Sequence, residues 1–293
     1  MVDVELFVLT LLNGILLGGI YAVAALGLSL VFGIMDVVNL AHGHFLMVGG
    51  YVAVLLFATA GITPLVGMFV AIGVLFLVGV VVQRLLLERV VDAGIEQPIL
   101  VLFGVALVLQ NLGRFFLGSN ARTTDLGLGL GAFTVGPMTL SSSRTVTFVV
   151  ATLLVAVTWV LLRRTNTGRA IRATAQNRTA AQYVGIDTDR VYIITMGIGS
   201  ALAGAAGALL SMLFPIDPFV GWSYLLKAFA VVVLGGVGSI GGTLVGGLVL
   251  GVSENVGSLY IGGSYRDVIT FAIFLGVLIL RPRGLFGGSG GSE

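Results

Sequence analysis

The sequence predicts an all-α fold, a polytopic bundle of about eight membrane-spanning helices. Of its 293 residues, 57% are hydrophobic and only 10% are charged, and the mean hydropathy is +1.11. A soluble domain carries about 25% charged residues, so this chain could not cover a surface that faces water. The 44 glycines and six prolines suit helices packed closely in lipid, where small residues let backbones approach.

The spanning segments follow from length, because a helix needs about 20 mostly apolar residues to cross a bilayer. We predict them at 6–33, 44–60, 64–86, 98–117, 145–163, 190–213, a broken segment at 224–258, and 266–281. Residues 118–144 are predicted to form a loop rich in glycine and serine. The first residues, MVDVE, lack the basic start of a secretory signal, so the first helix is expected to remain in the membrane.

The basic residues predict the orientation of one transmembrane domain over 1–287, which is followed by a flexible tail at 288–293. The loop at 163–190 holds the densest positive cluster: Arg163, Arg164, Arg169, Arg172, Arg178 and Arg190. By the positive-inside rule this loop faces the cytoplasm. Alternating the helices from there puts the N-terminus outside and the C-terminus in the cytoplasm, together with Arg84, Arg89, Arg281 and Arg283.

The glycines of VVVLGGVGSIGG, residues 231–242, predict a broken helix. They match the GxGxxG pattern of dinucleotide sites, but that fold needs alternating strands and helices, and here membrane helices flank the motif. We place the break at Gly235, Gly236, Gly238, Gly241 and Gly242, with a second helix at about 241–258. The glycines at 242, 246, 247 and 251 favour close helix packing. Alternatively, the start of this helix directs its positive dipole at an anionic substrate group.

The arginine-rich loop contains signals for two short helices. Asn166 or Thr167 can cap a helix that begins near residue 168, and Asn177 can cap a second at about 178–184. Gly185 is placed to end that helix in the left-handed conformation. Asp187 or Thr188 can then cap the next membrane helix.

The second short helix is expected to project with an apolar tip formed by Ala180, Ala181, Tyr183 and Val184. One interpretation is an ordinary positive-inside loop, whose arginines set only the topology. That interpretation explains the charge but gives no reason for an ordered helix with apolar residues facing water. We favour a docking surface for a cytoplasmic partner.

The two histidines lie in VVNLAHGHFLMVGGYVA, residues 37–53. His42 and His44 stand at i and i+2, on different faces of a helix, so a shared metal site is not expected. They cap or hydrogen-bond a helix end near the interface, or they line a polar path at the mouth of the bundle together with Asn39. The residues leave both alternatives open.

Glu254 lies within an apolar segment, where a carboxylate is costly unless it is paired or faces water. It is either a functional group or part of a hydrogen bond between helices. Lys227, the sole lysine, is expected to snorkel toward the outer surface.

Several kinds of chemistry are not expected. Without cysteine, the chain has no disulfide, zinc–thiolate site or iron–sulfur cluster, and its net charge of +2 is too small to suggest nucleic acid. No P-loop motif and no set of catalytic side chains stands out. We expect no metal, no cofactor and no enzymatic role.

Three long segments, in order, resemble the permeases of the branched-chain amino-acid ABC importers, the Liv-type family. Residues 18–53 resemble the family's first-helix signature, centred on Asn39, Ala41, His42, Gly43, Met47, Gly50 and Tyr51. Residues 167–191 resemble its cytoplasmic coupling loop, with Ala180, Ala181 and Gly185 at the positions of the EAA-type motif. Residues 217–254 and RPRGLFG, 281–287, complete the pattern. One departure is His44, where many relatives carry an acid.

The resemblance implies an importer built from this permease, a second related permease, two cytoplasmic ATPases and an external substrate-binding protein. It implies transport of branched-chain amino acids, with urea or short-chain amides as the alternative substrates. A stand-alone channel or secondary transporter is a further alternative. The residues expected to contact the ATPase are Arg169, Arg172, Ala180, Ala181, Tyr183, Val184 and Gly185. The residues expected along the translocation path are Asn39, His42, His44 and Glu254.

Overall fold

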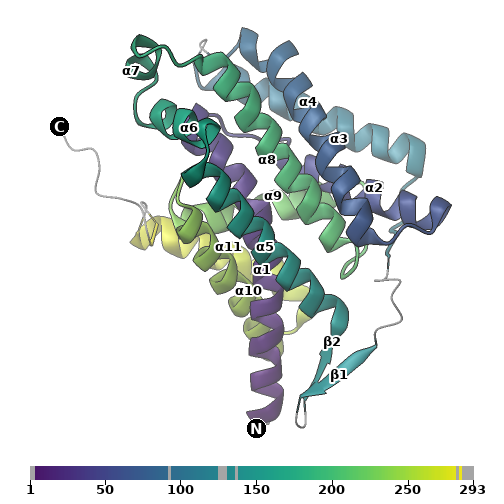
Figure 1. Ribbon diagram of the computed structural model, residues 1–293. Helices are drawn as coiled ribbons and strands as arrows, with labels where there is room; N and C mark the ends of the chain where they lie inside the picture. Colours follow the sequence, from purple (N-terminus) through teal and green to yellow (C-terminus); the bar gives the residue numbers. More distant parts are fainter. Residues whose placement is uncertain (1–3, 92–93, 125–130, 136–137, 282–283, 286–293) are drawn as a thin grey trace.

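The computed structural model describes residues 4–91, 94–124, 131–135, 138–281 and 284–285, and shows an all-α bundle (Figure 1). Its long helices are α1 (Val4–Met35), α2 (His42–Ala60), α3 (Pro64–Leu85), α4 (Glu96–Leu117), α5 (Ser142–Arg164), α8 (Thr188–Leu210), α9 (Val220–Gly235), α10 (Ile240–Ile261) and α11 (Arg266–Leu280). Two short helices, α6 (Asn166–Gln176) and α7 (Arg178–Tyr183), join α5 to α8. The predicted tail at 288–293 lies outside the described residues.

Eight helices of the described chain are long and apolar enough to cross a membrane, which makes this a multi-pass membrane protein. Their bounds agree with the predicted segments to within a few residues at most ends. Helix α9 is too short to be counted among these spanning helices, because its 16 residues extend over only about 24 Å. The predicted break in the segment 224–258 is therefore present, between α9 and α10.

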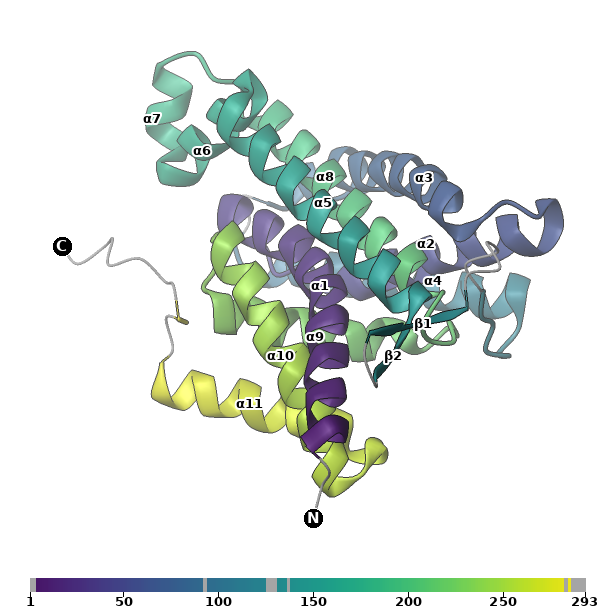
Figure 2. The ribbon, with the colours of Figure 1, turned by 60° about the horizontal axis from the view of Figure 1, so that its bottom comes forward.

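Helix α1 forms the centre of the bundle. It runs past α5, α8, α9 and α10, as Figures 1 and 2 both show. The apolar stretches of α1 and α8 are each 83% buried, whereas that of α4 is 11% buried. Helices α1 and α8 thus make the core, whereas most of the apolar surface of α4 is exposed.

The glycines of α10 allow this close packing on two sides. A Cβ on Gly242 or Gly246 would lie 1.9 or 2.7 Å from backbone oxygens of α9. A Cβ on Gly247 or Gly251 would lie 2.7 or 2.5 Å from backbone oxygens of α1. Because lipid supplies no hydrophobic force between helices, such contacts have to provide the attraction. Close packing was the favoured prediction for these four glycines, and it is confirmed.

The predicted loop at 118–144 contains some regular structure. Strands β1 (Ala132–Val135) and β2 (Met138–Ser141) pair antiparallel, with the partners of Ala132 and Val135 being Ser141 and Met138. Earlier in the loop, Arg122 exchanges two backbone hydrogen bonds of 3.0 and 2.8 Å with Ile216, which lies between α8 and α9. The loop is thereby tied to the bundle.

The two ends of the bundle differ. The hairpin and the start of α1 lie at one end, and α6 and α7 project from the other (Figures 1 and 2). The end of α1, Val91 and the junction of α6 with α7 line one hollow of about 380 Å³, so they share that second end. Leu285 joins them, since its N–H donates to the Leu234 oxygen at the end of α9 (2.8 Å). We call this the basic end, defined by residues 34–36, 91, 163–190, 234–241 and 285.

Candidate functional site

The segment at the basic end contains two short helices, each with a capped start. Thr165, Asn177 and Asp187 precede α6, α7 and α8, and each side-chain oxygen accepts the backbone N–H three residues later (3.0, 2.9 and 3.0 Å). These bonds satisfy donors that a helix start leaves free. Asn177 and Asp187 were predicted. The prediction of Asn166 or Thr167 was wrong, because the extended residue is Thr165 and the helix already begins at Asn166.

Gly185 ends α7 as predicted, in the left-handed conformation with φ of 83°. The N–H of Ile186 donates to the Ala181 oxygen (3.0 Å) and the N–H of Gly185 to the Gln182 oxygen (3.0 Å). This is the pattern of a Schellman motif. The motif needs a left-handed residue at position 185, and a residue with a branched Cβ disfavours that conformation. A Cβ at Gly185 would meet nothing within 4 Å, so the requirement comes from the backbone and not from space.

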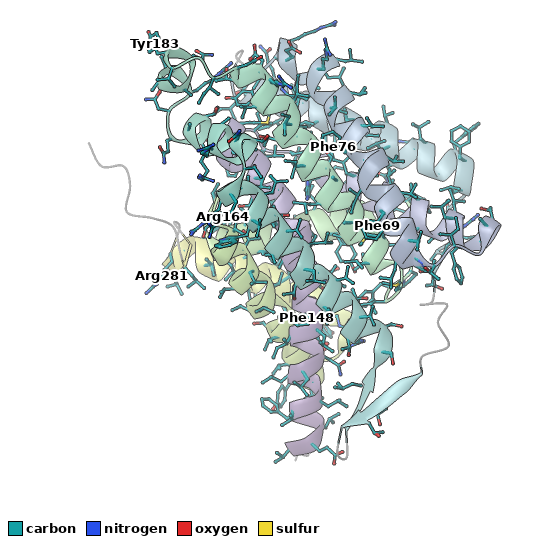
Figure 3. The ribbon with its side chains drawn as sticks, in the orientation of Figure 1. Phe69, Phe76, Phe148, Arg164, Tyr183 and Arg281 are labelled. Carbon is teal, nitrogen blue, oxygen red and sulfur yellow. The ribbon has the colours of Figure 1, made fainter. Side chains whose placement is uncertain are left out.

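The tip of α7 presents apolar side chains to solvent. Tyr183 is 86% exposed and Val184 77% exposed, and Ala180 shares their face at i, i+3 and i+4. Figure 3 shows Tyr183 at the extremity of the protein, far from the bundle. Ala181 was predicted on this face and is buried instead, at 3% exposed. It stands about 100° around the helix from Ala180, on the side that packs toward α8.

The two predicted arginines of this region lie on α6. Both Arg169 and Arg172 are exposed. The Arg169 guanidinium donates to the Asn166 side chain, whereas Arg172 lines a cavity described below.

The histidines lie inside the bundle. Helix α1 ends at Met35, Asp36 adopts the left-handed conformation (φ 52°), and the chain turns back so that α2 begins at His42. His42 Nε2 is 2.7 Å from the Ala24 oxygen, eleven residues before the end of α1 and thus about 16 Å along it. His44 packs edge-on against Trp222 of α9, with ring centroids 4.8 Å apart.

The histidines do lie at a helix end, the start of α2, but this end is deep in the bundle and not near the interface as predicted. His42, His44 and Asn39 are each at most 1% exposed. The Asn39 side chain accepts the Ala41 N–H (3.0 Å) and so shapes the turn that starts α2. The turn lies deep because the short loop between α1 and α2 folds back into the bundle. The composition of residues 36–41 does not predict this. The role of all three in a translocation path stays a prediction.

Glu254 belongs to a buried charged cluster. It is fully buried, and Lys227 Nζ lies 2.8 Å from one carboxylate oxygen while the Tyr21 hydroxyl donates to the other (2.6 Å). The Thr270 hydroxyl also donates to Glu254. Lys227 makes a second ion pair, at 3.3 Å, with Asp267.

The cluster corrects the prediction for Lys227. Instead of snorkelling outward, the residue is 8% exposed and lies between two acids and the rings of Tyr21 and Tyr224. Its partner is 27 residues away on the next helix. Because Tyr21, Lys227, Glu254 and Thr270 come from α1, α9, α10 and α11, the cluster joins four helices. A hydrogen bond between helices, one of the two alternatives for Glu254, is therefore present.

The helix break lies beside a cavity at the basic end. Of the five glycines predicted at the break, only Gly236 and Gly238 lie between the helices, because Gly235 is the last residue of α9 and Gly241 and Gly242 are in the first turn of α10. Gly236 and Gly238 have φ of 85° and 74°, and the Ser29 hydroxyl accepts the Gly238 N–H (2.9 Å). Ser239 caps α10 by accepting the Gly242 N–H (3.0 Å). The cavity, of about 690 Å³, lies between the end of α1, the second half of α5, α6 and the first turn of α10. Gly241 is exposed beside it.

Comparison with known proteins identifies the family. Residues 10–278 match the family model described as "Branched-chain amino acid transport system / permease component". The chain is 33% identical to the high-affinity branched-chain amino acid transport system permease protein LivH of Salmonella typhimurium, over 96% of both chains. It is 32% identical to the corresponding protein BraD of Pseudomonas aeruginosa, over 94% of both. It is 30% identical to the probable branched-chain amino acid transport permease protein LivH of Methanocaldococcus jannaschii, over 94% of this chain and 91% of the relative. These matches confirm the resemblance read from the motifs, and the chain belongs to the family of permease components of branched-chain amino acid transport systems.

Proposed function

We propose that this chain is the permease subunit of an ABC importer that moves branched-chain, hydrophobic amino acids across the cell membrane. An external binding protein delivers the substrate, and ATP hydrolysis in two cytoplasmic partner subunits drives the cycle. Family membership supports the permease role, and the names of the relatives support the substrate class. A second, related permease completes the path through the membrane.

The observation that carries the coupling role is the exposed tip of α7. Tyr183 and Val184 place apolar surface in solvent at the end of a helix that is capped on both sides. Such surface is costly unless a partner covers it. The ATPase subunits are the partner that fits, because an importer has to receive force at one end of its bundle.

The route by which force reaches the bundle follows from the contacts of α7. The Gln182 side chain donates to the Thr188 hydroxyl (2.9 Å), and Arg178 lies 3.7 Å from Asp189. Both contacts join α7 to the first turn of α8, which packs against α1, α2 and α3. A push on Tyr183 therefore moves α8 against the rest of the core, as alternating access requires.

The translocation path is proposed to open beside Asn39, His42, His44 and Glu254. These side chains are buried in the present conformation, so the path beside them forms only when helices separate. The glycine contacts between α1 and α10 provide a surface that can part without disrupting large interlocked side chains.

Substitution of Gly185 tests the coupling role in the complete transporter. Gly185→Val strains the left-handed turn, so ATP-driven leucine uptake is expected to be lost while the protein still inserts and assembles. Gly185→Asn is the matched control, since asparagine tolerates this conformation, and it is expected to retain most of the uptake. Thr179→Val, elsewhere on α7, controls for an added apolar, β-branched side chain away from the turn. Normal uptake by the valine variant would refute the role.

The substrate and the orientation need separate measurements. Uptake of leucine, isoleucine, valine, urea and acetamide by the reconstituted transporter distinguishes the amino-acid proposal from the amide alternative. Transport by the permease alone, without ATPase subunits, would instead indicate a channel or secondary transporter.

We propose that the basic end faces the cytoplasm, with the N-terminus outside and the C-terminus inside. The chain has no cysteine, so single variants can be labelled without background. Val4→Cys is expected to react with a membrane-impermeant thiol reagent from outside the cell. Tyr183→Cys, in the permease expressed without its ATPase subunits, is expected to react only from inside, and labelling of Tyr183→Cys in intact cells would contradict this orientation.

A further inference from the structure

The cavity beside the helix break is long and follows one helix. Its wall on α5 includes Thr152, Ala156, Trp159 and Arg163, which stand at i, i+4, i+7 and i+11 on a single exposed face. Eleven residues of helix extend over about 16 Å. The cavity thus reaches from the last turn of α5, at the basic end, to about half the depth of a hydrocarbon core of about 30 Å.

The end of the cavity near the last turn of α5 is positively charged. Arg163 and Arg172 line it from α5 and α6, and the Arg163 guanidinium lies over the Trp159 ring at 5.0 Å. Within the described part of the chain, neither arginine forms an ion pair with a carboxylate. The first turn of α10 opens here too, and adds the positive end of its dipole. This end is built to receive an anion.

The remainder of the cavity is mainly apolar, with the hydroxyl side chains of Ser29, Thr152 and Ser239 also in its lining. Its walls include Leu30, Val155, Ile171 and Leu244, from four different helices. No acidic side chain is among the described residues that line it. An amino acid bound here would leave its ammonium group without a partner, which opposes the cavity as a substrate site. A free phosphate would leave the apolar part unused.

We propose that this cavity binds one anionic glycerophospholipid. Its phosphate lies between Arg163 and Arg172, and one acyl chain extends along α5 past Trp159 and Ala156. Charged groups at the membrane surface, an aromatic ring at the interface and apolar walls at greater depth reproduce the order of a lipid molecule. Because its walls come from α1, α5, α6 and α10, the bound lipid holds α6 against the bundle.

Lipid retention by the purified permease complex tests this. The complex is reconstituted with phosphatidylglycerol or phosphatidylcholine, delipidated in detergent, and analysed by native mass spectrometry. The wild type is expected to retain one phosphatidylglycerol and no phosphatidylcholine. Arg163→Gln is expected to lower the retained phosphatidylglycerol by about fivefold, the effect of one arginine near an anionic headgroup. Arg164→Gln, one residue on and outside the cavity, is the matched control and is expected to change nothing.

A second pair of variants tests the apolar part without altering charge. Ala156→Trp fills the cavity and is expected to abolish retention, whereas Leu153→Trp, on the outer face of the same helix, retains the lipid. Size-exclusion profiles identify any variant that fails to fold. Equal retention by the Arg163 and Arg164 variants would overturn the proposal. So would displacement of the lipid by sn-glycerol 3-phosphate, which indicates a site for free anions. A disulfide dimer formed by Ala156→Cys would also overturn it, since it places a second copy of the chain there.

Discussion

The buried pair of Lys227 and Glu254 gives the sharpest test of what holds this bundle together. Lys227→Met removes the cation 2.8 Å from a carboxylate that is fully buried. Breaking such a pair from one side typically costs about 3–5 kcal/mol, because the remaining charge has no partner. Tyr21 and Thr270 still donate to Glu254, so we expect a loss of about 3 kcal/mol, at the lower end of that range.

The reverse substitution is expected to cost less. In Glu254→Gln, the amide oxygen at the Oε1 position can still accept from Lys227 and Thr270, and the amide NH2 at the Oε2 position can donate to the Tyr21 hydroxyl. Lys227 also keeps Asp267 at 3.3 Å. We expect a loss of about 1–2 kcal/mol, the cost of weakening a charged hydrogen bond. The double variant, Lys227→Met with Glu254→Gln, has no buried charge left and is expected to recover most of the loss of Lys227→Met.

Reversible unfolding in mixed detergent, titrated with dodecyl sulfate, measures these differences in free energy. The double-mutant cycle gives the coupling between the two residues directly. If Lys227→Met changes the unfolding free energy by less than about 1 kcal/mol, the loss of the cation does not leave Glu254 as a buried charge without a partner, and the reasoning fails. A double variant less stable than Lys227→Met alone would contradict the reasoning in the same way.

Three further predictions concern single positions. Gly207→Ala puts a Cβ 1.8 Å from a carbonyl oxygen of α2 and is expected to destabilise the protein by about 1–3 kcal/mol. In the control Gly73→Ala, the Cβ meets nothing within 4 Å, so the stability is expected to be unchanged or higher. Unfolding in detergent compares the two variants. In the first turn of α10, Gly242→Ala meets an oxygen of α9 at 1.9 Å and is expected to lower both the thermal midpoint and uptake. Gly241→Ala, its neighbour, has open space and is expected to alter neither. Asn177→Ala removes the cap of α7 at a cost of about 1 kcal/mol, so hydrogen exchange in α7 is expected to speed up and uptake to fall with insertion unchanged; equal exchange rates would show that the cap is not what orders α7.

The spanning helices could be predicted from the sequence because each depends on its own composition and length. The caps at Asn177 and Asp187 and the terminator at Gly185 were predictable for a similar reason, since each acts on backbone groups within a few residues. The cap of α6 was missed by one residue, as Thr165 takes the place assigned to Asn166 or Thr167. Errors of this size come from the choice between neighbouring polar residues, each able to bond a free N–H.

The candidate site was less predictable. Glu254 stood out because a carboxylate in an apolar segment needs a partner, but nothing near it identified Tyr21, which is 233 residues away. The one available signal was that Tyr21 and Thr270 are hydroxyl side chains within otherwise apolar segments. The cavity at Arg163 and Trp159 gave no sequence signal of its own, because basic and aromatic residues at a helix end have an ordinary role as membrane anchors.

By itself, the sequence determined that this protein spans the membrane many times. It also determined that the helical segment 224–258 is interrupted, and that the loop 163–190 carries a short helix with an exposed tip. These properties arise from short-range physics: transfer of apolar segments into lipid, and hydrogen bonds between groups close along the chain. The tertiary structure alone decided that Lys227 turns inward, that α2 begins deep inside the bundle, and that Ala181 faces α8. Each of these depends on which distant helix supplies the partner atom, and that choice is made by the packing of the whole bundle.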